Sequence, residues 1–260
     1  MNSRSLQWNM DYSKMTIGFS TGALSSGDFN AALSALRGTN ASAIELSALR
    51  IKEFDPLLQA LNSLPLERYD YIAIHAPSDF EITMEAQVAY RLLEEVPHKW
   101  NVVVHPDVIR DYTLWAPLGN RLCIENMDKR KSFGRTLKEL NSTFDRLPNA
   151  RLCLDLAHIR QVDPTMSQAV ELIDAMSSSI AQIHISDLNG VGSHLPLSTA
   201  AINAYQRVAS RLPHGIPVII ESVIEPSLID HEIARVQEAL SPRPVPIINR
   251  TIIPPHDNRN

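Results

Sequence analysis

A chain of 260 residues with 24 basic and 29 acidic side chains carries a formal net charge of −5, which provides no overall basic field for binding nucleic acid. Its 44% hydrophobic and 20% charged residues are ordinary for a globular enzyme, and its length is typical of a single α/β barrel. No apolar run approaches the length of a membrane span and Met1-Asn2-Ser3-Arg4 lacks a signal-peptide core, so we expect a cytoplasmic protein.

Short aliphatic runs recur about every thirty residues, the length of one βα unit. We predict strands at 16–20, 43–47, 71–75, 101–105, 121–125, 152–155, 181–185 and 217–221. Between and after them we predict helices at 29–37, 55–64, 83–95, 136–147, 163–178, 198–212 and 227–240, with only a short helix in 106–120. The pattern predicts one barrel domain over residues 1–240.

The C-terminal segment, residues 241–260, carries five prolines and is not predicted to be helical. We interpret it as an extended arm over the barrel or toward a neighbouring subunit, or as a disordered tail. It is the segment through which a homo-oligomer would form.

Side-chain alternation indicates how the strands are arranged. One face of each run is uniformly aliphatic, as in Val102 and Val104 or Leu152 and Leu154, while the other face is mixed in size and polarity. Helices cover a uniformly aliphatic face, and a mixed face that ends in polar groups is typical of a closed interior. The sequence therefore predicts a (β/α)8 TIM barrel, with Cys123 and Cys153 as small buried residues inside it.

Acids and histidines fall at or beside the ends of six predicted strands, where a barrel places its active site. They are His75, His105, Glu125, Asp155, His184 and Glu221, with His158 and His194 one loop further out and Glu45 facing inward on the second strand. Carboxylates packed together repel unless a cation lies between them. A mixed oxygen and nitrogen shell suits zinc, manganese or iron better than calcium or magnesium.

Several of these residues lie in recognisable motifs. The motifs are His75-Ala76-Pro77, His105-Pro106, Glu125-Asn126, Cys153-Leu154-Asp155-Leu156-Ala157-His158 and His184-Ile185-Ser186-Asp187. They resemble the signatures of endonuclease IV within the xylose isomerase-like TIM barrel superfamily (AP endonuclease family 2), which also includes sugar isomerases and epimerases. The resemblance extends from Ile17 to Glu221.

That resemblance implies a metal site shared by both branches of the superfamily, held by Glu125, Asp155, His184 and Glu221. In endonuclease IV the corresponding residues hold three zinc ions that hydrolyse the phosphodiester on the 5′ side of an abasic site. Here Gly192 stands where the family has an Asp two residues before the histidine that matches His194, and Leu195-Pro196-Leu197-Ser198 replaces a glycine-rich run. We therefore expect two tightly bound metals, zinc or else manganese, and a third that is weak or absent.

One interpretation of the function is a multinuclear hydrolase of phosphate esters. His75 and His105 with Glu125 hold one metal, and Glu125 bridges to a second. Eight metal-ligand candidates belong to this scheme: His75, His105, Glu125, Asp155, His184, Glu221, His158 and His194. The basic loop with Lys129, Arg130, Lys131 and Arg135 is either a phosphate-binding element or a solvated surface loop.

The other interpretation is a mononuclear sugar or sugar-phosphate isomerase or epimerase. Glu125 and Glu221 then exchange a proton with the substrate, and His158 positions a hydroxyl. The ligands His75 and His105, which one metal does not need, favour the hydrolase, whereas an inward Glu45 that contacts substrate favours a sugar enzyme. A non-catalytic metal-binding or ligand-binding barrel is a third possibility. The substrate classes are accordingly a phosphorylated small molecule, a sugar or abasic-site nucleic acid.

Overall fold

The computed structural model of the protein describes residues 15–242. The proline-rich segment and the subunit contact expected from it fall almost wholly on residues 243–260, outside the described part of the chain. No helix among residues 15–242 is both long enough and apolar enough to cross a bilayer.

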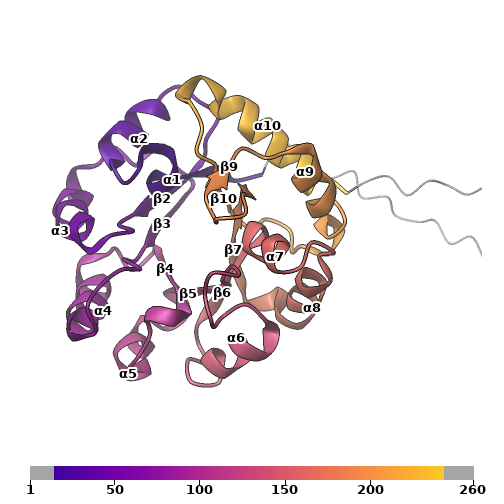
Figure 1. The fold of residues 1–260 in the computed structure, drawn as a ribbon. Helices are drawn as coiled ribbons and strands as arrows, with labels where there is room; N and C mark the ends of the chain where they lie inside the picture. Colours follow the sequence, from indigo (N-terminus) through magenta and orange to yellow (C-terminus); the bar gives the residue numbers. More distant parts are fainter. Residues whose placement is uncertain (1–14, 243–260) are drawn as a thin grey trace, which may run out of the picture.

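Parallel strands close into a barrel with the order β1-β10-β7-β6-β5-β4-β3-β2, and helices surround it (Figure 1). The strands are β1 Ile17–Ser20, β2 Ala43–Ser47, β3 Tyr71–His75, β4 Asn101–Val104, β5 Leu122–Glu125, β6 Arg151–Asp155, β7 Ile180–Ile185 and β10 Val218–Ile220. A separate antiparallel pair, β8 Asp187–Leu188 and β9 His194–Leu195, forms a hairpin after β7. The eight-stranded barrel predicted from the sequence is confirmed.

The helices are α1 Thr21–Ser25, α2 Phe29–Ala35, α3 Ile51–Ala60, α4 Glu85–Glu95, α5 Tyr112–Trp115, α6 Leu137–Phe144, α7 Leu156–Val162, α8 Ser167–Met176, α9 Thr199–Tyr205 and α10 Ile229–Leu240. Short 3₁₀ turns lie at Leu61–Ser63, Ile82–Met84, Pro106–Val108, Ala116–Arg121, Ser177–Ser179, Ala209–Arg211 and Pro226–Leu228. The short helix expected in 106–120 is α5.

Two predicted helix starts are wrong. The helix placed at Asp55-Pro56 begins at Ile51 as α3, because Asp79 accepts a hydrogen bond from the Ile51 amide (2.9 Å) and Glu53 accepts one from the Arg50 amide (3.1 Å), which caps the helix four residues earlier. The helix placed at 163–178 begins at Ser167 as α8, and a further helix that was not predicted, α7, precedes it. Asp155 caps α7 by accepting a hydrogen bond from the His158 amide at 2.7 Å.

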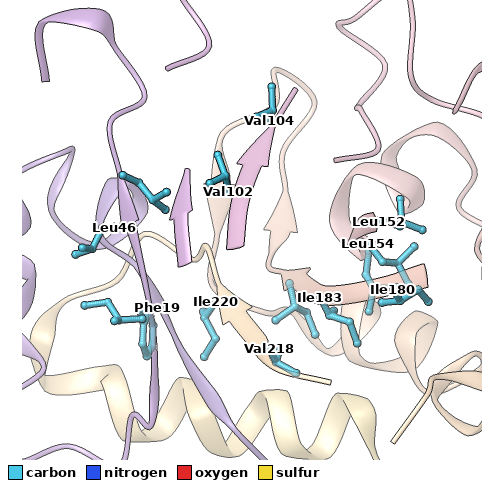
Figure 2. Close-up of a cluster of buried hydrophobic side chains, with 14 of the residues drawn as sticks. Phe19, Leu46, Val102, Val104, Leu152, Leu154, Ile180, Ile183, Val218 and Ile220 are labelled. Atoms are coloured by element: carbon cyan, nitrogen blue, oxygen red, sulfur yellow. The ribbon is translucent and has the colours of Figure 1, made fainter. Parts of the chain in front are cut away.

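The hydrophobic core lies between the barrel and its helices. Outward-facing strand residues such as Phe19, Val104, Leu154 and Ile220 are fully buried in one large cluster (Figure 2). Inside the barrel a second, small cluster contains Val103, Cys123, Cys153 and Ala181, and both cysteines are free thiols. The alternation predicted from the sequence therefore separates the two cores, which leaves the C-terminal ends of the strands to polar side chains.

Candidate metal centre

The C-terminal ends of the strands bring the predicted acids and histidines together. Two groups of side chains have possible ligand atoms that all lie within 4.8 Å of one another: His75, His105 and Glu125, and Glu125, Asp155, His184 and Glu221. All of these side chains are buried except that of His105, which is partly buried with 15% of its side chain exposed. These are the two sets that the sequence predicts, and Glu125 belongs to both.

The first set is made of two imidazoles and one carboxylate. His75 Nε2 lies 3.1 Å from Glu125 Oε2, and His105 Nε2 lies 3.4 Å from the same oxygen. His75 Nδ1 donates to the Ala76 carbonyl at 2.8 Å, so the proton of the neutral ring is on Nδ1 and Nε2 carries the lone pair. Both Nε2 atoms therefore face one point beside Glu125.

The second set is richer in carboxylates. His184 Nδ1 lies 3.7 Å from Glu125 Oε1 and 3.6 Å from Glu221 Oε1. Among the described residues His184 Nδ1 and Asp155 Oδ2 are buried without a hydrogen-bond partner. Buried polar atoms without partners are costly, and two of them aimed into one cluster of ligands fit a cation there.

Glu125 divides its two oxygens between the sets. Oε2 faces His75 and His105, whereas Oε1 lies 3.1 Å from His158 Nδ1 and 3.7 Å from His184 Nδ1. Its two oxygens therefore face two different groups of imidazoles. The adjacent Asn126 holds the neighbouring strand end in register, because its side-chain amide donates to the Asp155 carbonyl (2.9 Å) and accepts from the Asp155 amide (2.8 Å).

Glu45 lies beneath the cluster and is fully buried, which differs from the substrate-facing position expected from the sequence. Its Oε2 is 3.0 Å from His184 Nε2 and accepts from the Gln182 amide at 2.7 Å. Gln182 Nε2 is also 2.7 Å from His184 Nε2, but an amide nitrogen is no acceptor, so the imidazole proton is directed to Glu45. Glu45 thereby leaves His184 Nδ1 free to act as a ligand.

Charges inside the cluster balance one another. Burial raises the pKa of Asp155 to about 6 and also raises that of Glu221. Burial acts to raise the pKa of Glu125 as well, yet the charges of His184 and His105 hold it well below the usual range. Burial acts to lower the pKa of His75, but its hydrogen bond to Glu125 raises that pKa to about 9. The raised pKa values of His75 and His184 favour protonated rings, whose positive charge takes the place of a dication's, and metal binding would release those protons. Burial lowers the pKa of His105, which favours its neutral form.

His158 and His194 were expected one loop further out, but both adjoin the second set. Their ring centroids are 5.9 Å apart, His158 Nδ1 lies 3.1 Å from Glu125 Oε1, and His194 Nδ1 lies 3.7 Å from Glu221 Oε2. His158 Nδ1 lies 2.9 Å from the Asn126 carbonyl, and Nε2 is 3.9 Å from Asp128 Oδ2. His194 Nδ1 lies 2.8 Å from Ser186 Oγ. Asp128, a fully buried acid three residues after Glu125, was not among the site residues predicted from the sequence, although its position shortly after a strand end was a signal.

The four basic residues of the predicted phosphate-binding loop have different surroundings in the structure. Lys131 pairs with Asp107 at 2.6 Å, and Arg135 lies 3.4 Å from Glu139. Lys129 is exposed, and Arg130 pairs with Asp128 beside the outer histidines. Arg130 is therefore the one of the four whose ion-pair partner also faces His158.

A third group of possible ligand atoms combines Cys153 with Glu125 and His184. Burial raises the pKa of the Cys153 thiol well above its ordinary value, so this sulfur is a neutral thiol in the absence of a cation. The group shares two of its three members with the carboxylate-rich set and describes the same place in the barrel.

A family model described as "Xylose isomerase-like TIM barrel" matches residues 111–240. No curated protein is similar enough to this chain to be matched. Three solved structures share the fold at low identity. Endonuclease IV from Thermus thermophilus has a TM-score of 0.52 and 18% identity, covering 86% of this chain and 98% of that one.

Another solved structure with this fold is a xylose isomerase-like TIM barrel protein from Mycobacterium smegmatis in complex with magnesium. It has a TM-score of 0.54 and 14% identity, covering 89% of this chain and 100% of that chain. The third is D-allulose 3-epimerase from Methylomonas sp. in complex with D-allulose, with a TM-score of 0.51 and 14% identity over 87% of this chain and 95% of that chain. At these identities the likeness establishes the fold alone.

Proposed function

This chain belongs to the xylose isomerase-like TIM barrel family, and on that premise we propose that it is a divalent-metal-dependent hydrolase of phosphate esters. The proposed centre is dinuclear and lies at the C-terminal end of the barrel. The superfamily is mostly enzymatic, and its solved members include an endonuclease and an epimerase.

The observation that carries this proposal is the orientation of Glu125. Its two oxygens face two different sets of nitrogen ligands, with Oε2 3.1 Å from His75 Nε2 and Oε1 3.7 Å from His184 Nδ1. A mononuclear enzyme needs only the second set. The imidazoles at His75 and His105 suit zinc, and the carboxylates of the second set accommodate zinc or manganese.

Two dications at such a centre would supply an activated water as nucleophile and electrostatic stabilisation of the phosphoryl oxygens. Residues of the chain would hold the ions and leave a nitrogen for the substrate. Glu125 would bridge, and Glu45 would keep His184 in the ligating orientation through the 3.0 Å contact to Nε2. His158 donates Nδ1–H to the Asn126 carbonyl when neutral, so its Nε2 is the nitrogen that remains for a substrate oxygen.

A second candidate function is a mononuclear isomerase or epimerase of a sugar or sugar phosphate. The favouring observation is that Glu125 Oε1 and Glu221 Oε1 lie at nearly equal distances, 3.7 and 3.6 Å, from His184 Nδ1. Two carboxylates around one ligand nitrogen could exchange a proton with a chelated substrate. A non-catalytic metal-binding or ligand-binding barrel is the third candidate.

Activity measurements distinguish these candidates. The protein, loaded in parallel with zinc or manganese, is incubated with abasic-site duplex DNA, with bis(4-nitrophenyl) phosphate, and with a panel of ketoses and aldoses. We expect phosphodiester hydrolysis that is lost in Glu125→Gln and retained in Glu94→Gln, an exposed change on α4. Sugar interconversion without hydrolysis would favour the isomerase, and neither activity in the metal-loaded protein would favour the binding barrel.

A further inference from the structure

Arg130, in the loop between β5 and α6, is held in a fixed position at the edge of the metal centre. We propose that it is an anion-binding residue and that the substrate carries a phosphate group that docks on its guanidinium. This inference rests on the proposed function, because it identifies the part of the substrate that the hydrolase would recognise.

Asp128 fixes the guanidinium. The Arg130 amide donates to Asp128 Oδ1 (2.8 Å), while Nε and Nη2 lie 2.7 and 2.5 Å from Oδ2. The Asp128 carboxylate is fully buried, whereas the Arg130 side chain is 50% exposed. A buried acid that engages one edge of an arginine removes most of its rotamer freedom and leaves the opposite edge accessible to solvent.

Gly192, in the β8–β9 hairpin, provides the surface against which Arg130 packs. A Cβ at position 192 would lie 2.3 Å from Arg130 Nε and 2.4 Å from Cζ, so the guanidinium occupies the space of a side chain. Gly192 is buried although its neighbour Val191 is 73% exposed, and its φ of 80° favours glycine. The glycine therefore makes room for a cation next to the hairpin that carries His194.

This cation borders the metal centre. Asp128 Oδ2, which binds Arg130, is 3.9 Å from His158 Nε2, and His158 Nδ1 is 3.1 Å from Glu125 Oε1. One imidazole ring thus separates the Asp128–Arg130 pair from the bridging carboxylate. A fixed positive charge therefore lies one imidazole ring away from Glu125 of the proposed metal centre.

The free edge of Arg130 determines the ligand chemistry. Asp128 uses Nε and one side of Nη2, and within residues 15–242 Nη1 has no hydrogen-bond partner. The remaining N–H groups form a planar fork that matches two oxygens of a phosphate. Lys131 pairs with Asp107 and Arg135 with Glu139, so Arg130 is the one of these three cations whose carboxylate partner also faces His158.

The test uses inorganic phosphate as the probe and chelator-treated, metal-free protein, so that binding does not depend on a metal. Calorimetric titration compares the wild-type protein with Arg130→Gln, Gly192→Ala and the control Arg37→Gln, an exposed arginine after α2. We expect Arg130→Gln to weaken phosphate binding about tenfold or more, as for a lost charge-assisted hydrogen bond. Gly192→Ala should also weaken phosphate binding, because its Cβ would displace the Arg130 guanidinium although the arginine itself is retained. Arg37→Gln should bind like the wild-type protein.

Thermal unfolding is measured on the same proteins, because Arg130 could serve only to join two loops. Lower thermal stability with unchanged phosphate affinity in Arg130→Gln would overturn the inference and show that Arg130 only joins the two loops. Absence of saturable phosphate binding in the wild-type protein would also overturn it.

Kinetics separate this inference from the proposed function. In a protein that hydrolyses bis(4-nitrophenyl) phosphate, Arg130→Gln should raise KM with little change in kcat. Phosphate binding through Arg130 without any hydrolysis would refute the proposed function and leave the inference standing.

Discussion

Metal stoichiometry is the property that best separates a dinuclear hydrolase from a mononuclear isomerase. The perturbation is the double substitution His75→Ala plus His105→Ala. It removes two of the three ligand residues of the first set and none of the four in the second set, Glu125, Asp155, His184 and Glu221. Because the second set is complete by itself, the metal content should fall from about two ions per chain to about one.

The assay is elemental analysis after loading with zinc or manganese and dialysis against a mild chelator. His214→Ala plus His231→Ala is the matched control, since both histidines are exposed and lie outside the ligand sets. Circular dichroism establishes that each variant is folded. One ion per chain in the wild-type protein, unchanged by His75→Ala plus His105→Ala, would refute the dinuclear reasoning and support the isomerase. Two ions retained by the double variant would show that the first set is not a metal site.

Three further outcomes follow from the same geometry. Glu125→Gln should reduce hydrolysis at least tenfold in a folded protein, and retention of more than a tenth of the activity would exclude the bridging role. Glu45→Gln should weaken metal binding at the second set roughly 10–100-fold in chelator competition, because His184 loses the carboxylate that orients its ring. If the variant binds metal as tightly as the wild-type protein, Glu45 does not have that role. Burial raises the pKa of Cys123 to about 12 and that of Cys153 well above its ordinary value, so both side chains are neutral thiols at pH 8. Iodoacetamide should therefore label neither cysteine in the native protein and both after unfolding. Rapid labelling of the native protein would contradict the buried positions.

Local patterns in the sequence were sufficient to predict the barrel and to group the candidate ligand residues. Strand alternation depends only on neighbouring residues, so the outward position of Val104 and Leu154 and the inward position of Cys123 followed directly. Strand ends meet at one edge of a parallel barrel, and for that reason Glu125 and His184 could be grouped before any distance was known. Helix boundaries were less predictable, because the start of α3 depends on a hydrogen bond from Ile51 to Asp79, 28 residues away.

Tertiary structure alone decided the surroundings of Glu45 and Arg130. Glu45 was identified as inward from its strand, but its contact with His184 joins residues 139 positions apart and exists only because the barrel closes. Arg130 was one of four equivalent cations in the sequence. The packing of its loop against the β8–β9 hairpin paired it with Asp128 and placed it in the space that Gly192 leaves open. Contacts between loops depend on how separate βα units pack, and periodicity within one unit carries no information about that packing.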